Sequence, residues 1–256
     1  MINPNALADS LVLVTGASGD LGKHFSKTLS RFGATVVLAA RRLDRLQDLQ
    51  KEIESNGGRA LAVSMDVTSR QSVTAAFEVI HETFEAPCDI LINNSGIGQK
   101  SWFTQTSEEE WSNIVDTNLT GVWRVAQQFS RALISAEKPG SIINIASITG
   151  LQPSQMISGY AASKAAVDHL TRNMAIELAR SGIRVNAIAP GYFKTAINDE
   201  FLDSEPGQRM KKRIAMRRFG EYADLDGPIL LLASDAGAYM TGATIVVDGG
   251  HTLVPL

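Results

Sequence analysis

The chain has 256 residues, of which 44% are hydrophobic and 20% are charged, a balance typical of an ordinary globular protein. The net charge of −3 argues against nucleic acid as a partner, and no apolar run is long enough to cross a membrane. A single cysteine and an N-terminus without an export signal favour the cytoplasm. The four histidines lack metal-ligand spacing, so we expect no metal site.

Short β-branched runs alternate with helical periodicity along the whole chain. Strands are predicted at residues 11–15, 35–40, 60–65, 89–94, 142–145, 183–189 and 244–248. Helices are predicted at residues 21–32, 43–55, 69–84, 107–134 and 222–233, with another that carries Tyr160 and ends near residue 179. An irregular segment is predicted from residue 190 to about residue 218.

This alternation continues without repeats or low-complexity linkers, which predicts a single domain over residues 1–256. The expected fold class is α/β, a Rossmann-like doubly wound parallel β-sheet with helices on both faces. In such sheets ligands bind beyond the carboxyl ends of the strands, so the segments that follow the predicted strands are the candidates for a site.

The first predicted strand leads into the glycine-rich turn TGASGDLG at residues 15–22. Glycines at 16, 19 and 22 allow a tight turn, close approach of a pyrophosphate and close packing of the next helix. Because a carboxylate would repel a phosphate at this helix start, we expect Asp20 to cap the helix and face away from the ligand. A glycine turn can also join a strand to a helix without binding anything.

The second predicted strand ends at Ala40, where proteins that prefer NAD normally carry an acidic residue. Arg41 and Arg42 follow instead, and the planar guanidinium group of arginine fits a phosphate. We therefore predict NADP(H) as the cofactor, with NAD less favoured, Arg41 as the main phosphate contact and Arg42 as a secondary one. The alternative is that both arginines are solvated and Asp44 neutralises one of them.

Residues 141–164 combine an apolar strand, Ser147 and a helix that carries Tyr160 and Lys164. Four residues apart on a helix, the tyrosine and the lysine share a face. An ammonium beside a phenol favours the phenolate, so we expect Lys164 to lower the pKa of Tyr160 toward neutral pH. Ser147 would add a hydroxyl to the same site. A surface tyrosine packed on a lysine stem has the same spacing, so the motif depends on its context.

Further motifs supply that context. They are NNSG at residues 93–96, Asn118 in VDTNLTGVW, YAASK at residues 160–164, NAIAPGYFKT at residues 186–195 and TGATIVVDGG at residues 241–250. With the glycine turn and Ser147, they resemble the single-domain branch of the short-chain dehydrogenase/reductase (SDR) family over essentially the whole chain. That branch usually has glycine where Asp20 stands, and NNAG in place of NNSG.

The resemblance implies a catalytic set of Asn118, Ser147, Tyr160 and Lys164. Tyr160 would be the general acid for carbonyl reduction and the general base for alcohol oxidation. Lys164 would also hold the nicotinamide ribose, Ser147 would bind the substrate oxygen, and Asn118 would hold a water of a proton relay.

The cofactor contacts implied by the resemblance follow the strands. They are Gly16, Ser18, Gly19, Asp20, Leu21, Asp66, Val67, Asn93, Gly96, Tyr160, Lys164, Pro190, Gly191 and Thr195. Asp66 would bind the adenine ring, although an aspartate there could instead cap the next helix. Asn93 and Gly96 would line the cofactor cleft, and Pro190, Gly191 and Thr195 would close over the nicotinamide amide.

The function implied is NADP-dependent interconversion of a ketone and a secondary alcohol, as in a carbonyl reductase or alcohol dehydrogenase, by a homotetramer acting on a small molecule. The alternatives are a 3-oxoacyl-[acyl-carrier-protein] reductase, a keto-sugar or gluconate reductase and, from another class, a catalytically silent scaffold. The intact catalytic set argues against a scaffold.

The polar segment at about residues 192–218 is long for a loop, which favours a substrate lid. Its basic residues could attract an acidic carrier or a phosphorylated substrate, although a solvated helix face is the simpler interpretation. These basic residues are Lys211, Lys212, Arg213, Arg217 and Arg218.

Overall fold

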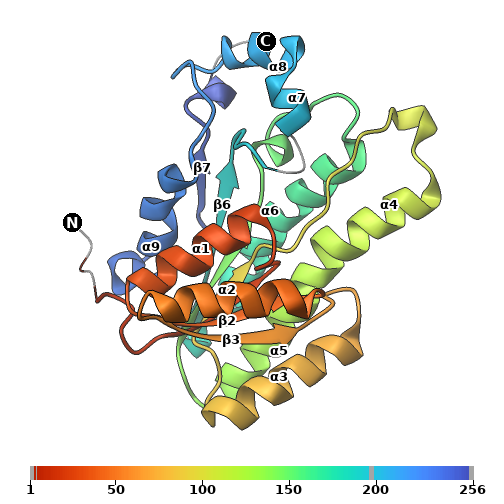
Figure 1. Ribbon diagram of the computed structural model, residues 1–256. Helices are drawn as coiled ribbons and strands as arrows, with labels where there is room; N and C mark the ends of the chain where they lie inside the picture. The colour runs from red at the N-terminus through yellow and green to blue at the C-terminus, as the bar shows by residue number, and fades with distance from the viewer. Residues whose placement is uncertain (1–2, 4, 196–198, 254–256) are drawn as a thin grey trace.

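The computed structural model describes residues 3, 5–195 and 199–253. Seven parallel strands form one sheet in the order β3-β2-β1-β4-β5-β6-β7 (Figure 1). The strands are β1 (Leu11–Thr15), β2 (Thr35–Ala40), β3 (Arg59–Ser64), β4 (Ile90–Asn93), β5 (Gly140–Ile145), β6 (Ile183–Pro190) and β7 (Thr244–Val247). The strand order reverses between β1 and β4. This topology confirms the predicted single-domain, doubly wound α/β fold.

Helices cover both faces of the sheet. They are α1 (Asp20–Arg31), α2 (Leu43–Ser55), α3 (Arg70–Phe84), α4 (Glu108–Val115), α5 (Gly121–Ser135), α6 (Ser158–Leu178), α7 (Asp199–Asp203), α8 (Glu205–Lys211) and α9 (Asp226–Ala233). Residues of α1, α2 and α9 pack in one core cluster, and residues of α3, α5 and α6 pack in the other. No helix in the described ranges is long and apolar enough to span a membrane.

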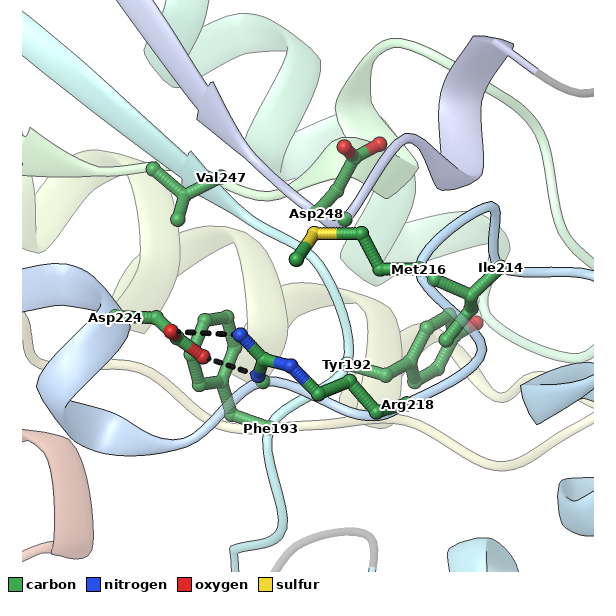
Figure 2. A pocket seen from close by; sticks show the side chains of 10 residues that line it. Tyr192, Phe193, Ile214, Met216, Arg218, Asp224, Val247 and Asp248 are labelled. Atoms are coloured by element: carbon green, nitrogen blue, oxygen red, sulfur yellow. Dashed lines mark hydrogen bonds and ion pairs between the residues drawn. The ribbon is translucent and has the colours of Figure 1, made fainter.

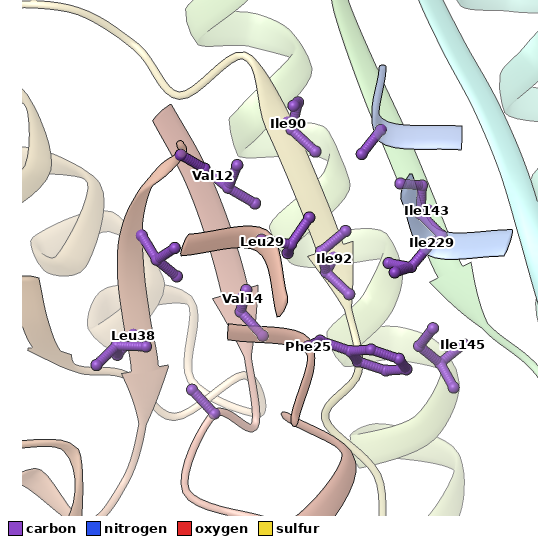
Figure 3. Packing of buried hydrophobic residues seen from close by; sticks show 14 of the residues in the cluster. Val12, Val14, Phe25, Leu29, Leu38, Ile90, Ile92, Ile143, Ile145 and Ile229 are labelled. Atoms are coloured by element: carbon purple, nitrogen blue, oxygen red, sulfur yellow. The ribbon is translucent and has the colours of Figure 1, made fainter. Parts of the chain in front are cut away.

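Alternate side chains of the central strand β1 belong to these two clusters, because successive residues of a strand point to opposite faces. In β1, Val12 and Val14 belong to the first cluster and Leu13 belongs to the second. Figure 3 shows Phe25 and Leu29 of α1 in the first cluster, among side chains of the central strands. These residues of β1 and α1 are fully buried, namely Val12, Leu13, Val14, Phe25 and Leu29. This packing places the start of α1 over the point where the strand order reverses.

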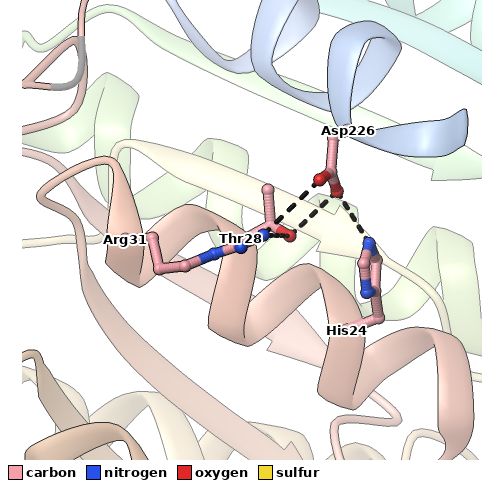
Figure 4. A network of polar contacts seen from close by, with 4 residues as sticks. All are labelled: His24, Thr28, Arg31 and Asp226. Atoms are coloured by element: carbon pink, nitrogen blue, oxygen red, sulfur yellow. Dashed lines mark hydrogen bonds and ion pairs between the residues drawn. The ribbon is translucent and has the colours of Figure 1, made fainter. Parts of the chain in front are cut away.

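A polar network adds to the contact between α1 and α9 (Figure 4). The Asp226 carboxylate contacts His24 Nε2 at 2.7 Å and accepts a hydrogen bond from Thr28 Oγ1 at 2.9 Å. Arg31 lies farther from it, at 3.5 Å. Two turns of α1 are therefore joined to the first residue of α9.

The predicted continuous helix over residues 107–134 is wrong in one respect. A π-helical turn (Asp116–Thr120) separates α4 from α5. The side chain of Asn118, inside this turn, is bonded to the backbone of Ile97, which draws the wider turn toward the sheet edge. The predicted helix over residues 222–233 likewise begins as a short 3₁₀ helix (Tyr222–Leu225) before α9.

The segment predicted to be irregular, residues 190–218, contains α7 and α8. Ser204 caps α8 by accepting a hydrogen bond from the backbone of Gly207 at 3.3 Å. Pro206 lies in the first turn of α8, where its missing N–H costs no hydrogen bond. Residues 196–198 of the predicted lid lie outside the described residues.

Candidate active site

A cleft of about 400 Å³ lies at the carboxyl ends of the strands, where the fold predicts a ligand site. Most of the residues predicted to touch the cofactor or the substrate line it. They are Gly16, Ser18, Gly19, Asp20, Leu21, Arg42, Gly96, Ser147, Tyr160, Lys164, Pro190, Gly191 and Thr195. Five other predicted residues are not part of this lining as the described chain shows it, and they are Arg41, Asp66, Val67, Asn93 and Asn118.

The three glycines of the first turn have different surroundings. Gly16 has a φ of +65°, and a Cβ there would lie 3.0 Å from Asn94 Nδ2. A Cβ on Gly22 would lie 2.2 Å from the Gly16 carbonyl oxygen, so Gly22 permits close packing of α1. A Cβ on Gly19 would meet nothing closer than 3.5 Å. Gly19 therefore leaves open space at the N-terminus of α1, and this space fits the pyrophosphate of a dinucleotide.

Asp20 does not cap α1 as predicted. The helix begins at Asp20, and the extended residue before it, Gly19, is the N-cap. Asp20 therefore lies in the first turn and lines the cleft, and its negative charge contributes to the raised pKa of Tyr222. The prediction failed because the glycine, which has no side chain to bond the helix, takes the cap position.

Arginines stand at the end of the cleft formed by β2 and α2. Arg42 is the N-cap of α2, and Arg45 lies in its first turn. Both line the cleft, and neither forms an ion pair within the part of the chain that the structure describes. Arg41 lies close enough to Asp66 for its charge to lower the carboxyl pKa. The sequence prediction missed Arg45, which its position three residues after Arg42 could have indicated.

Asp66 bonds within its own turn. Its Oδ1 atom accepts hydrogen bonds from the backbone N–H of Thr68 at 2.9 Å and from the Thr68 hydroxyl at 2.7 Å. Burial raises the pKa of Asp66. The two hydrogen bonds from Thr68 and the charges of Arg41 and Arg124 lower it, and the net result is a lowered pKa. The cap of α3 is Ser69, so Asp66 does not cap that helix. Val67, the next residue, is buried.

The two asparagines at the end of β4 have different roles. Asn93 is buried, and its Nδ2 atom donates to Asn144 Oδ1 of β5 at 3.0 Å. Asn94, which the sequence analysis did not single out, lines the cleft and donates to the Thr15 carbonyl oxygen at 3.0 Å. Asn93 therefore holds two central strands together. The cleft lining that we predicted for Asn93 is formed by Asn94 and the residues that follow it.

The end of β5 and helix α6 bring the predicted proton-transfer residues to the cleft. Ser147 follows β5, and its Oγ atom accepts hydrogen bonds from the backbone N–H and the hydroxyl of Thr149 at 3.2 and 2.9 Å. Tyr160 and Lys164 share a face of α6, with Lys164 Nζ 5.7 Å from the centroid of the Tyr160 ring. A phenol, an aliphatic hydroxyl and an ammonium thus meet at one end of the cleft.

The predicted pKa of Tyr160 is wrong in direction. Burial raises it, a hydrogen bond with Ser147 only partly opposes this, and Tyr192 raises it further. Lys164 is 4% exposed, and burial lowers its own pKa to about 8. Its ammonium donates to the backbone carbonyl oxygen of Ile145 and not to the phenol. The cost of desolvation, which spacing on a helix does not reveal, outweighs the attraction that we expected.

Asn118 lies behind these residues. Its Oδ1 atom accepts from the backbone N–H of Ile97 at 2.8 Å, and its Nδ2 atom donates to the Ile97 carbonyl oxygen at 3.0 Å and to Ser163 Oγ at 3.2 Å. A Cβ built on Gly96 would lie 3.3 Å from Asn118 Oδ1 and 3.7 Å from Lys164 Nζ, so the two side chains border the same small space.

Comparisons with known proteins agree with this geometry. The family model for short chain dehydrogenase matches residues 10–206. The chain is 39% identical over 251 residues to a 3β-hydroxysteroid dehydrogenase from Eggerthella lenta, which covers 97% of this chain and 96% of that protein. It is 35% identical over 246 residues to the 5-keto-D-gluconate 5-reductase of Escherichia coli, with 96% of each chain covered.

The fold of the chain also matches that of a solved structure. A gluconate 5-dehydrogenase from Burkholderia cenocepacia, crystallised with NADP and tartrate, superposes with a TM-score of 0.94 at 32% identity, and 99% of each chain is covered. The parallel sheet, the cleft and these matches establish that the chain belongs to the short-chain dehydrogenase/reductase family. It is an oxidoreductase of the kind that acts on hydroxyl and keto groups.

Proposed function

We propose that this chain is an NADP-dependent oxidoreductase that interconverts a small ketone and a secondary alcohol, with Tyr160 as the general acid and base. The observation that carries the proposal is the meeting of Tyr160, Ser147 and Lys164 in a cleft that Gly16 and Gly19 of the first turn also line. A catalytically silent scaffold would not require these three groups together.

The state of Tyr160 suits proton donation. Because its pKa is raised, the phenol is protonated at neutral pH and can neutralise the alkoxide that develops as a ketone is reduced. Ser147, whose hydroxyl lies beside the phenol, would bind the same substrate oxygen. A bound nicotinamide would supply or accept the hydride. Lys164 would bind its ribose, and Asn118 would hold a water that connects the lysine to solvent.

NADP rather than NAD is the proposed cofactor because of the charge around the end of β2. Ala40 occupies the position where an acidic residue would select the free ribose, and Arg42 and Arg45 present guanidinium groups to the cleft. No ion pair joins Asp44 to either arginine or to Arg41 in the described part of the chain. The NADP in the Burkholderia cenocepacia structure supports the proposal.

A keto-sugar or gluconate reductase is the second candidate. It is favoured by the similarity to the keto-gluconate reductase and to the gluconate dehydrogenase described above. A 3-oxoacyl-[acyl-carrier-protein] reductase would need the same proton-transfer residues, and acetoacetyl thioesters therefore belong in any substrate screen.

Three further proposals concern the whole protein. Residues 192–218 form a substrate lid within the single domain of residues 1–256, the assembly is a homotetramer, and the protein works in the cytoplasm. The position of Phe193 and Thr195 in the lining of the cleft supports the lid, because the segment starts at the site. Light scattering of the purified protein tests the tetramer.

Replacing Tyr160 by phenylalanine tests the proposed function. With any ketone that the unmodified protein reduces, kcat should fall by roughly a hundredfold or more while NADPH still binds, because only the proton donor is lost. Tyr239→Phe is the matched control, since the Tyr239 side chain is 104% exposed and far from the reacting groups. A Tyr160→Phe protein that keeps most of its turnover would show that the proton comes from another group.

A further inference from the structure

We propose that Ser154, Tyr192 and His251 form a polar wall beside Tyr160 that binds hydroxyl groups of the substrate next to its reacting carbonyl. We call these three residues the polar wall. This inference rests on the proposed function and narrows its substrate to a hydroxylated ketone. The sequence motifs assigned no role to any of the three residues, although Tyr192 lies within NAIAPGYFKT.

Tyr192 is the centre of the polar wall. It comes two residues after Pro190, the last residue of β6, and its phenol is close enough to Tyr160 to affect the pKa of that group. A hydrogen bond joins its side chain to Ser154, while burial raises the pKa of Tyr192 itself. Tyr192 is partly exposed, and it remains a protonated donor at neutral pH. It therefore offers a second hydroxyl within the reach of a substrate held at Tyr160.

The side of Tyr192 away from Tyr160 is closed by apolar residues. Figure 2 shows the Tyr192 ring next to Ile214, in a smaller cavity of about 200 Å³ that Met216 also lines. Across this cavity the guanidinium of Arg218 donates to both carboxylate oxygens of Asp224, at 2.6 and 2.9 Å. These two charges therefore pair with each other, and the Asp248 carboxylate, which also lines the cavity, is bonded to backbone N–H groups.

His251 contributes an unsatisfied polar atom. Its ring lies against the Tyr192 ring, with 5.4 Å between centroids and 37° between planes. Its Nδ1 atom is buried and has no hydrogen-bond partner among the described residues. Buried polar atoms are rarely left unpaired, so this nitrogen lacks a partner, and a substrate hydroxyl would supply one when the ring turns toward the substrate.

The charge state of His251 suits a neutral ligand group. Burial lowers its pKa, Asp248 opposes this, and the charge of Arg213 adds to the lowering. His251 is therefore neutral at pH 7, and one ring nitrogen donates a hydrogen bond while the other accepts one. A hydroxyl, which both donates and accepts, can pair with either nitrogen.

The turn that carries His251 is held by several hydrogen bonds. The Asp248 carboxylate accepts from the backbone of Gly250 at 2.8 Å and from the backbone of Thr252 at 2.7 Å. Gln152 Nε2 donates to the Thr252 carbonyl oxygen at 2.7 Å, which ties the turn to the segment that carries Ser154. The polar wall is thus a fixed arrangement of three segments, as a specific binding surface requires.

These groups discriminate by chemistry. A ketone with hydroxyls on the adjoining carbons can pair with Tyr192 and His251, while an unsubstituted ketone offers these two side chains no polar group. A site built to hydrogen-bond a hydroxyl rejects an analogue that lacks it, because its own buried polar groups then lose their hydrogen bonds. We therefore expect the protein to prefer polyhydroxylated ketones over aliphatic ketones of the same length.

The test compares two ketones of equal carbon number, one polyhydroxylated and one unsubstituted, with NADPH as the reductant. Tyr192→Phe keeps the ring and removes the hydroxyl, and His251→Phe replaces the imidazole by a somewhat larger apolar ring. In each variant the ratio of kcat/KM for the hydroxylated ketone to that for the plain ketone should fall roughly tenfold or more, mainly through KM. Tyr239→Phe serves as the matched control.

Two results would overturn the polar wall. One is an unchanged ratio in both variants. The other is an equal fall in kcat for both ketones, because that result would mean that Tyr192 and His251 position Tyr160 and do not bind substrate hydroxyls.

A binding measurement separates this inference from the proposed function. Tartrate, a dihydroxy acid that cannot be reduced as a ketone, is titrated by calorimetry into the NADPH complex of the Tyr160→Phe protein and of the same protein with Tyr192→Phe added. The added change should weaken tartrate binding roughly tenfold. Loss of binding without turnover of any ketone would count against the reductase and support the polar wall. If the unmodified protein reduces a ketone but the two variants bind tartrate equally well, the result would support the reductase and count against the polar wall.

Discussion

The ammonium of Lys164 donates a hydrogen bond of 2.7 Å to the backbone carbonyl oxygen of Ile145, the last residue of β5. This bond fixes a nearly buried cation at the edge of the sheet, one helical turn from Tyr160. Burial brings the pKa of Lys164 down to about 8 and raises that of Tyr160. The lysine therefore loses its charge before the tyrosine does.

The pH dependence of ketone reduction should reveal Lys164. Because the cationic lysine is the form proposed to bind the ribose, kcat/KM should fall as the pH rises through about 8. Lys164→Arg keeps a positive charge at every accessible pH, so its profile, whatever its height, should lose this fall. Initial rates between pH 6 and pH 10 measure both profiles. A wild-type profile that is flat across pH 7 to 9 contradicts the assignment.

The choice of cofactor should depend on the arginines that line the cleft. Arg42→Ala and Arg45→Ala should each raise KM for NADPH roughly ten- to a hundredfold while changing KM for NADH little, because each removes a charge-assisted bond to the extra phosphate. The sequence predicted Arg41 as the main phosphate contact and Arg42 as a secondary one, and Arg41→Ala tests that order.

The matched control for the cofactor experiment is Arg59→Ala. Arg59 is exposed at the start of β3, at the opposite end of the sheet from the cleft. Equal kcat/KM values for NADPH and NADH in the unmodified protein would show that the interpretation of the end of β2 is wrong.

Two glycines of the first turn should respond differently to alanine. Gly19→Ala places its methyl group in the open space beside α1, so the protein should fold normally and bind NADPH at least tenfold more weakly. Gly22→Ala brings a methyl group to 2.2 Å from the Gly16 carbonyl oxygen, so it should lower the melting temperature instead. Thermal unfolding without cofactor, together with NADPH titration, separates the effects. Similar unfolding curves for the two variants would contradict this division.

Asp89 should make stability depend on pH. Burial raises its pKa to about 6, although its carboxylate accepts a hydrogen bond from the backbone of Leu11 at 3.0 Å. A carboxyl whose folded-state pKa is raised gives stability that is full below about pH 4 and is lost as the pH rises through about 6.

Asp89→Asn keeps the acceptor and removes the charge. Its free energy of unfolding should match that of the unmodified protein near pH 4 and exceed it by about 1 to 2 kcal/mol at pH 7. Urea unfolding at both pH values provides the measurement. A difference that does not change with pH would show that Asp89 titrates normally.

The sequence was sufficient where local and tertiary preferences agree. The runs at β1 and β2 are β-branched and bounded by turn residues, and the predicted bounds of both strands match the structure. It failed where a local signal has two meanings. The polar segment at residues 190–218 was predicted to be irregular, yet Pro206 fits the first turn of a helix, and α8 forms there.

The electrostatics of the site depend on contacts that sequence spacing does not contain. The positions of Tyr160 and Lys164 on one helix face were predictable, but the direction of the Tyr160 pKa shift depends on burial by other segments. The same holds for Tyr192, His251 and Ser154, which lie far apart in the sequence. Only the folded chain shows that they meet.

The π turn at Asp116–Thr120 makes the position of Asn118 sensitive to residue count rather than residue identity. A π turn is an α-helix with one residue more than the regular ladder needs. Deleting a single residue there would let α4 and α5 join as one regular helix, and it would rotate the preceding side chains by about 100° relative to those that follow. Asn118 would then leave Ile97, although no residue of the catalytic set had been substituted. The number of residues between α4 and α5 therefore determines where the side chain at position 118 lies.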